Sequence, residues 1–312
     1  MDLSIVATMY HSAGFLAEFH RRCAASADKL GVKDLEIVLV NDGSPDDSLN
    51  RALELHRQDP RVVVVDLSRN FGHHKAMMTG LKHARGELVF LIDCDLEEPP
   101  ELLEAFYAEM KRAPADVIFG QQETRRGGFF ERFSGACFYW ILKVLSNYPL
   151  PSNVLTARLM TRRYVRSLVQ HRDQEVFILG LWSITGFEQR AIKAEKSSKG
   201  RSTYTLARKL ALTANAITSF SNKPLIYIAY LGISISVVAI VCAAYLVFRR
   251  IFFGDYLEGW PSLIVSIWLL GGLTILCLGV IAIYLSRIFT ETKRRPYTIV
   301  RQIHRRDPEE AK

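Results

Sequence analysis

Residues 87–95 read Glu87-Leu88-Val89-Phe90-Leu91-Ile92-Asp93-Cys94-Asp95, an apolar run that ends in two acids. Side chains alternate along a strand with period two, so Asp93 and Asp95 point the same way at the mouth of a buried strand. Two neighbouring anions are costly unless a cation neutralises them. Mg²⁺ or Mn²⁺ suits such a pair and usually also binds substrate phosphates. The alternative is a strand end with solvated acids, so the rest of the sequence has to decide.

The chain before residue 120 alternates apolar strands with helical segments. Strands are expected at residues 4–10, 35–40, 61–67, 87–92 and 116–120, and helices at 15–30, 46–59, 75–84 and after Pro99-Pro100. Later in the chain, a basic helix is expected near 158–169. Fully apolar strands separated by helices indicate an α/β fold with a parallel sheet covered on both faces. Ligands of such sheets bind outside the carboxyl ends of the strands. Asn41-Asp42 and Asp93–Asp95 both fall at such ends, so we expect them to share one crevice.

Two later segments, residues 225–248 and 261–286, contain no charged residue. Each is long enough to cross a hydrocarbon core of about 30 Å at 1.5 Å per residue. Tyrosines and tryptophans near their ends favour membrane spans over buried core helices. Basic residues from Arg287 to Arg306 follow the second span, whereas the connecting loop has only Arg249 and Arg250. This bias predicts that both termini are cytoplasmic.

These patterns predict six parts of the chain. They are a cytosolic catalytic domain over residues 1–200, an amphipathic interfacial helix over 201–224, a transmembrane helix over 225–248, a short non-cytoplasmic loop over 249–260, a second transmembrane helix over 261–286, and a basic cytoplasmic tail over 287–312. The net charge is +8, but no helix-turn-helix, zinc-finger or RNA-recognition signature accompanies the basic residues. Nucleic acid is therefore not an expected partner, and phosphorylated substrates and an anionic lipid membrane are.

Two common phosphate-binding motifs are missing from the sequence. It contains no G-x-x-x-x-G-K-[ST], and no G-x-G-x-x-G follows the first strand. A P-loop NTPase is thereby excluded, and a dinucleotide-binding enzyme is not expected. A metal at Asp93 and Asp95 could instead clamp a diphosphate and stabilise charge on a leaving group. Glu97 lies two positions beyond Asp95 and could add a third oxygen ligand.

Five motifs occur in order: Val40-Asn41-Asp42-Gly43-Ser44, Leu67-Ser68-Arg69-Asn70-Phe71-Gly72, Asp93-Cys94-Asp95-Leu96-Glu97-Glu98-Pro99-Pro100, Arg158-Leu159-Met160-Thr161-Arg162-Arg163 and Ser202-Thr203-Tyr204. Together they resemble glycosyltransferase family 2, in particular its polyprenyl-phosphate glycosyltransferase branch, which includes bactoprenol glucosyltransferases and dolichyl-phosphate mannose synthases. The resemblance implies a GT-A catalytic domain with a Rossmann-like, mostly parallel sheet. It also implies a multi-pass protein of the inner (cytoplasmic) membrane. Some members form tetramers, so a homo-oligomer is an expectation.

The reaction implied by the resemblance is an inverting transfer of one sugar. The donor would be a nucleotide diphosphate sugar, and the acceptor a membrane polyprenyl phosphate of the undecaprenyl type. The product would be a polyprenyl-monophosphate sugar for cell-surface glycan modification. Two alternatives stay open. One is a family 2 transferase that extends a lipid-linked glycan at a sugar hydroxyl, and the other is a catalytically degenerate membrane scaffold.

The resemblance also implies roles for individual residues. Asp93, Asp95 and Arg158 are expected in catalysis, and Asp93, Asp95 and Glu97 at the Mg²⁺ or Mn²⁺. The nucleotide is expected to contact Thr8, Tyr10, Asp42 and Asp93. The residues expected at the acceptor phosphate are Arg125, Arg126, Arg132, Ser134, Lys199, Arg201, Ser202 and Tyr204. For each single arginine in this set, a solvated surface position is an equal alternative.

Several positions depart from the family pattern. Asn41 replaces the first Asp of the usual Asp-Asp-Gly-Ser, and Thr156 replaces the Asp of Asp-Phe-Arg-Leu, which is proposed as the base in some relatives. An alcohol acceptor needs a base, but a phosphate monoester with a second pKa near 6 is already largely dianionic at neutral pH. The missing base thus favours a phosphate acceptor. For His73 and His74 we expect a loop or helix-cap role rather than metal binding.

Overall fold

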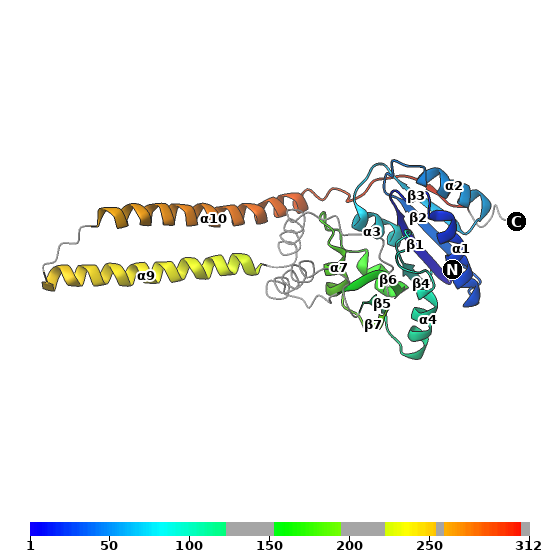
Figure 1. Ribbon diagram of the computed structural model, residues 1–312, viewed down its shortest axis with the longest axis horizontal. Helices are drawn as coiled ribbons and strands as arrows, with labels where there is room; N and C mark the ends of the chain where they lie inside the picture. The colour runs from blue at the N-terminus through cyan, green and yellow to red at the C-terminus, as the bar shows by residue number, and fades with distance from the viewer. Residues whose placement is uncertain (123–152, 195–221, 254–258, 307–312) are drawn as a thin grey trace. The chain divides into compact units, whose positions relative to one another are not determined.

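The computed structural model describes residues 1–122, 153–194, 222–253 and 259–306. Within these ranges the chain forms two compact units (Figure 1). One unit holds a β-sheet with its covering helices, and the chain returns to this unit at Arg295. The other holds the long helices α9 (Lys223–Phe253) and α10 (Trp260–Thr292).

The sheet has eight strands in the order β7-β5-β6-β4-β1-β2-β3-β8. The strands are β1 (Leu3–Met9), β2 (Leu35–Asn41), β3 (Val62–Leu67), β4 (Leu88–Leu91), β5 (Val117–Gln121), β6 (Val154–Thr161), β7 (Gln189–Lys193) and β8 (Val300–His304). β4, β1, β2 and β3 are parallel neighbours, so their carboxyl ends meet at one edge. β6 runs antiparallel between β4 and β5. The α/β class with a mostly parallel central sheet is therefore confirmed.

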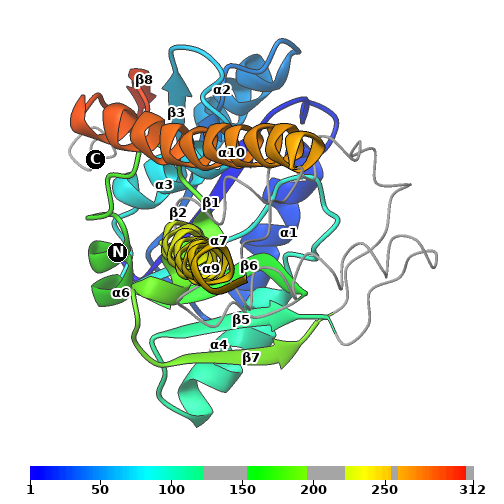
Figure 2. The ribbon, with the colours of Figure 1, turned by 90° about the vertical axis from the view of Figure 1, so that its left-hand side faces the viewer.

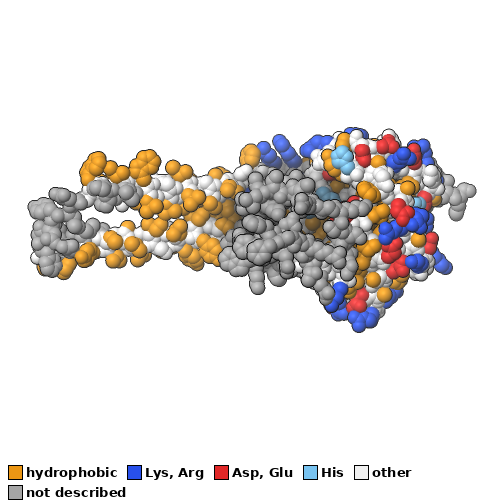
Figure 3. All heavy atoms as spheres, viewed as in Figure 1, with side chains coloured by type: hydrophobic (Ala, Val, Ile, Leu, Met, Phe, Trp, Pro, Cys, Tyr) orange, Lys and Arg blue, Asp and Glu red, His pale blue; other side chains and the backbone are white. Residues whose placement is uncertain are grey.

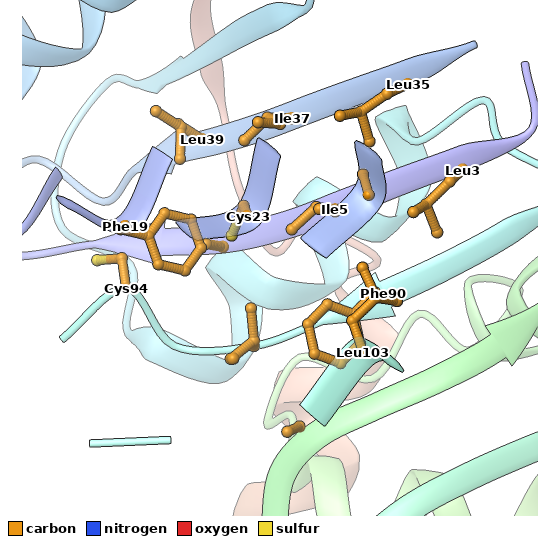
Figure 4. Close-up of a cluster of buried hydrophobic side chains, with 14 of the residues drawn as sticks. Leu3, Ile5, Phe19, Cys23, Leu35, Ile37, Leu39, Phe90, Cys94 and Leu103 are labelled. Atoms are coloured by element: carbon orange, nitrogen blue, oxygen red, sulfur yellow. The ribbon is translucent and has the colours of Figure 1, made fainter. Parts of the chain in front are cut away.

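Helices cover both faces of the central strands (Figure 2). The helices are α1 (Leu16–Lys29), α2 (Ser48–Gln58), α3 (His73–His83), α4 (Leu102–Arg112), α6 (Arg162–Leu168) and α7 (Ile178–Ile184). α1, α2 and α4 share one core with alternate side chains of β1, β2 and β3. In Figure 4, Phe19 and Cys23 of α1 lie among Ile5, Ile37 and Leu39. Removing these apolar side chains from water contributes about 1.5–3 kcal/mol for each large residue.

Helix α3 lies on the opposite face of the sheet and approaches it closely. A Cβ atom on Gly80 would lie 2.5 Å from Cγ1 of Val6 and 2.8 Å from Cγ2 of Val40. Only a residue without a side chain therefore fits between α3 and strands β1 and β2. This contact matters for the site because α3 begins at His73, beside the carboxyl ends of the same strands.

The five predicted strands are confirmed, and no strand end differs from its prediction by more than one residue. The helix expected near 158–169 is wrong in its first part, because residues 154–161 form β6. This segment pairs with both β4 and β5, and such tertiary pairing outweighs local helical spacing. Helix α6 begins only at Arg162, where the side chain of Thr161 accepts the amide hydrogen of Tyr164.

The two apolar helices are confirmed as candidate membrane spans by length and composition. The qualifying segments are Lys223–Cys242 and Ser266–Thr292, and none of their most apolar stretches is buried. Figure 3 shows apolar side chains over the outer surfaces of both helices. α9 and α10 are longer than predicted, since they continue through Phe253 and Thr292. Most of the interfacial helix predicted over 201–224 lies outside the described residues, and α9 has already begun at Lys223.

The basic tail predicted over 287–312 needs correction, because its middle is part of the sheet. β8 pairs antiparallel with β3, with Val64 opposite His304 and Val65 opposite Ile303. Beyond the strand, Arg305 Nη2 lies 3.3 Å from Oε2 of the buried Glu36. The arginines of this segment are therefore not only a solvated charge cluster. They help to hold β8 against β3, whose backbone groups would otherwise be unpaired at the edge of the sheet.

Replacing Gly80 by alanine tests the close approach of α3. The added Cβ overpacks the contact with Val6 and Val40, at a cost of about 1–3 kcal/mol that the better helix propensity of alanine offsets only in part. We expect G80A to lower the melting temperature by roughly 2–8 °C. The matched control is G14A, since nothing lies within 4 Å of a Cβ at Gly14. Equal melting temperatures for the two variants would contradict this packing.

Candidate active site at the strand ends

The carboxylate of Asp42 joins the end of β2 to the loop that follows β3. Asp42 is buried, and it accepts hydrogen bonds from the amides of Phe71 at 2.7 Å and Gly72 at 3.0 Å. Burial raises the pKa of Asp42, although both amide hydrogen bonds act in the opposite direction. This residue, predicted to bind the nucleotide, thus also shapes the loop that leads into α3.

Gly43 brings the same two loops into van der Waals contact. Its φ is +60°, and a Cβ atom there would lie 2.4 Å from the amide nitrogen of Asn70 and 2.5 Å from the carbonyl carbon of Arg69. Both the left-handed backbone and the lack of space require glycine. The glycine of the Asn41-Asp42-Gly43-Ser44 motif therefore has a physical reason in this structure.

Asp46 ties a third loop, the one after β1, to this arrangement. Its carboxylate accepts the hydroxyls of Ser44 at 2.5 Å and Ser48 at 2.6 Å, and the amide of Ala13 at 3.2 Å. Burial alone would raise the pKa of Asp46, but these hydrogen bonds outweigh it and lower the pKa. Ser44 Oγ also accepts the amide of His11 at 2.8 Å. The preceding residue, Tyr10, keeps half of its surface exposed beside this loop.

His73, at the first position of α3, connects β1 with β4. Its Nδ1 lies 3.0 Å from the hydroxyl of Thr8, and its Nε2 lies 3.2 Å from Oδ1 of Asp93. Desolvation lowers the pKa of this half-exposed ring, but the hydrogen bond and charge of Asp93, with smaller effects of Asp42 and Asp95, raise it overall. His73 therefore lies within ion-pair distance of the Asp93 carboxylate, which favours the protonated form of the ring. The strand ends meet a second time where Cys94 Sγ donates to the carbonyl of Thr8.

The residues after β4 form a tight turn around Asp95. Its Oδ1 accepts the amide of Glu97 at 2.9 Å, and Leu96 between them has a φ of +60°. No group of three His, Cys, Asp or Glu side chains comes together as a metal site within the described ranges. Glu97 is therefore not gathered with Asp93 and Asp95 into a three-residue ligand set, and its metal role stays a prediction. The two aspartates still fit Mg²⁺ or Mn²⁺, which are commonly held by one or two carboxylates plus substrate phosphates.

Glu98 fixes the start of β6 next to this turn. Its buried carboxylate accepts the amides of Thr156 at 3.1 Å and Ala157 at 2.7 Å.

Arg158, the residue after Ala157, is almost fully buried, with 1% of its surface exposed. It donates to the carbonyls of Leu155 and Thr156 and lies over the ring of Trp182. Burial lowers the pKa of Arg158 to about 9. The structure thus places Arg158 in contact with protein carbonyls and rings, and its catalytic role stays a prediction.

The structure brings together Thr8, Asp42 and Asp93 through His73 and its loop, and it places Tyr10 and Asp95 at the same edge of the sheet. The predicted acceptor residues, Arg125, Arg126, Arg132, Ser134, Lys199, Arg201, Ser202 and Tyr204, lie outside the described residues.

Three residues organise the site in ways that the sequence did not predict: Asp46 and Glu98 were given no role, and His73 was expected only in a loop or helix-cap role. For His73 a signal existed, because a helix that follows a strand of a parallel sheet begins at the edge where the carboxyl ends of the strands meet. Asp46 accepts the amide of Ala13, and Glu98 accepts the amides of Thr156 and Ala157; no local pattern reveals these contacts with other segments.

Comparison with known proteins agrees with this geometry. The model of Glycosyl transferase family 2 matches residues 4–169. A protein of Mycobacterium tuberculosis named "Putative glycosyltransferases" is 53% identical over 98% of this chain and 90% of its own length. The "Uncharacterized glycosyltransferase YkcC" of Bacillus subtilis is 33% identical over 97% of this chain and 94% of its own length. The "Prophage bactoprenol glucosyl transferase homolog" of Escherichia coli is 30% identical over 97% of this chain and 99% of its own length. The sheet is thus a GT-A fold, and the chain belongs to glycosyltransferase family 2.

Proposed function

We propose that this transferase moves one sugar from a nucleotide diphosphate sugar to a membrane polyprenyl phosphate of the undecaprenyl type, with inversion at the anomeric carbon. The bond between the anomeric carbon and the donor diphosphate breaks, and a bond from that carbon to an oxygen of the lipid phosphate forms. The products are a polyprenyl-monophosphate sugar and a nucleoside diphosphate. Such a product would supply cell-surface glycan modification.

One observation carries the proposal: a single chain joins two carboxylates at the strand ends of a family 2 domain to two helices long enough to cross a bilayer. A transferase with a water-soluble acceptor has no need of two such helices. The relative from Escherichia coli, whose name specifies bactoprenol, matches nearly the whole chain, including the part with these helices. This match supports a polyprenyl phosphate as the acceptor.

Asp93 and Asp95 would hold the divalent cation. When bound, Mg²⁺ or Mn²⁺ supplies positive charge to the leaving diphosphate. The protein's own contribution is to aim the carboxylates, through the contact of Asp93 with His73 and the turn at Asp95. Asp42 and the exposed ring of Tyr10 would then meet the nucleoside.

The surroundings of Thr156 support a phosphate acceptor over a sugar hydroxyl. A hydroxyl acceptor needs a base, and threonine cannot serve as one at neutral pH. The carboxylate of Glu98 contacts this part of β6, but it is buried and accepts two backbone amides. A lipid phosphate needs positioning and cations rather than a base.

The position of β8 supports a hairpin that crosses the membrane twice. A sheet cannot lie on both sides of a membrane, and β8 pairs with β3 in the sheet that carries the site. The chain that leaves this unit before α9 must therefore return to the same side after α10. With the basic residues after α10, this arrangement favours a cytoplasmic catalytic domain with both termini on that side.

The proposal is tested by incubating the purified protein with polyprenyl phosphate, Mg²⁺ and a panel of nucleotide sugars. Formation of a sugar-phosphoryl lipid supports it. Nucleotide release that requires a glycan acceptor would point to the hydroxyl transferase. Absence of both turnover and nucleotide binding would point to the membrane scaffold.

Replacement of Asp93 by asparagine tests the metal assignment. D93N removes one charged oxygen ligand, so we expect metal-dependent turnover to fall by roughly three orders of magnitude. Mn²⁺ titration followed by paramagnetic resonance should show weakened binding to the same variant. The control is D28N, at an exposed aspartate on α1. Retention of both activity and Mn²⁺ affinity in D93N would remove Asp93 from the metal site.

Replacement of Thr156 by alanine tests whether a base is needed. Because only the backbone amide of Thr156 is bonded to Glu98, T156A should keep that contact and stay folded. We expect kcat to change by less than about tenfold, whereas loss of a general base typically costs 10²–10⁴-fold. A folded T156A with a loss in that range would give Thr156 a direct role.

The pH dependence of the rate tests the dianionic acceptor. The second pKa of a phosphate monoester is near 6, so below about pH 6 kcat/KM for the lipid should fall about tenfold per pH unit. A lipid phosphonate, whose second pKa is higher, should shift this fall to higher pH. A fall that stays in place with the phosphonate would come from a protein group and contradict the proposal.

A further inference from the structure

Arg301 connects strand β8 to the site at the carboxyl ends of the strands. Arg301 of β8 places Nη1 3.2 Å from Oδ2 of Asp66 on β3, and its Nη2 donates to the carbonyl of Ser68 at 2.8 Å. The carboxylate is buried, with 5% of its side chain exposed, whereas the arginine is 58% exposed. The β3–β8 register shifts at Asp66 and Leu67, an irregularity of the kind that redirects side chains at a sheet edge.

Asp66 passes this contact on to the loop after β2. Its other oxygen, Oδ1, accepts a hydrogen bond from Nδ2 of Asn41 at 2.8 Å. Oδ1 of Asn41 in turn accepts the amide of Ser44 at 3.1 Å. Asn41 and Asp66 are each 3% exposed. A continuous chain of polar contacts therefore runs from Arg301 through two buried side chains to the turn that contains Asp42 and Gly43.

This chain of contacts explains why position 41 is an asparagine here. The amide donates to Asp66 and accepts from Ser44 at the same time, which a carboxylate cannot do. An aspartate at position 41 would also place two buried anions together. Arg301 supplies the cation that Asp66 needs, and removing it would leave a buried carboxylate without its charge partner. Asn41 would then lose its fixed acceptor.

We propose that Arg301 is a positioning residue for the nucleotide sugar: it holds Asp66 and Asn41 so that the 41–44 turn presents Asp42 to the donor. This inference rests on the proposed function for its donor. It assigns to the segment after the membrane hairpin a part in donor binding, not only in closing the sheet edge.

The test compares R301A, R301K and the control R306A in the full-length protein. Arg306 follows the same strand and donates to the carbonyl of Arg57, away from the site. Hydrogen–deuterium exchange of the apo protein follows the peptide that spans residues 41–48. We expect exchange at Ser44 to become roughly three- to tenfold faster in R301A, because the acceptor of its amide is no longer held. R301K should be intermediate, since lysine keeps the charge but not the second contact, and R306A should match the wild type.

Steady-state kinetics provide the second readout. KM for the nucleotide sugar should rise by roughly three- to tenfold in R301A at little change in kcat, because only donor binding is impaired. In a D66N background, R301A should add no further effect on KM, since the charge that needs Arg301 is gone. A purely structural role would lower the active fraction and leave KM unchanged.

Two failures are distinguishable. A wild-type protein that turns over no nucleotide sugar overturns the proposed function and the donor role of Arg301 with it. An active R301A whose KM equals that of the wild type overturns the positioning role alone, whatever its exchange rate.

Discussion

The two hydrogen bonds that Asp42 accepts from Phe71 and Gly72 are the constraint on which the site depends. They hold the end of β2 against the loop that starts α3, and Gly43 makes the approach close enough. The start of α3 then places His73 between Thr8 of β1 and Asp93 after β4. Four parallel strands would bring their ends to one edge in any such sheet. It is this set of loop contacts that turns the edge into one polar surface with a fixed arrangement.

Much of this could be predicted from the sequence because it follows from local patterns. The apolar run before Asp93 and the Val-rich run before Leu67 predict their strands, and the two uncharged segments predict α9 and α10. The helix expected near 158–169 failed at β6, where pairing with strands on both sides decides the conformation. β8 was missed for the same reason, since its partner lies far away in the sequence. Asp46 and Glu98 bind backbone amides in other segments, so their roles are visible only in three dimensions.

The charged side chains at the site are held in place by groups of the protein. Acids gather at the strand ends. Backbone amides hold Asp42, Asp95 and Glu98, and the imidazole of His73 lies 3.2 Å from Oδ1 of Asp93. Carboxylates bound in this way keep their orientation while still offering oxygen atoms to a cation. Arg158 is the reverse case, a cation among carbonyls and aromatic rings whose burial lowers its pKa. Its guanidinium folds back on β6 and donates to the carbonyls of Leu155 and Thr156.

The sheet of this transferase is completed by its last strand to be synthesised. Ser68 and Arg301, which contact each other across β3 and β8, are 233 positions apart in the chain. Until the ribosome has passed both apolar helices, the edge of β3 has no partner and Asp66 has no guanidinium. Synthesis of both apolar helices must therefore precede the final closure of the domain. A nascent chain that stalls before its second helix would therefore carry an open sheet edge, a surface that pairs with other chains and promotes aggregation.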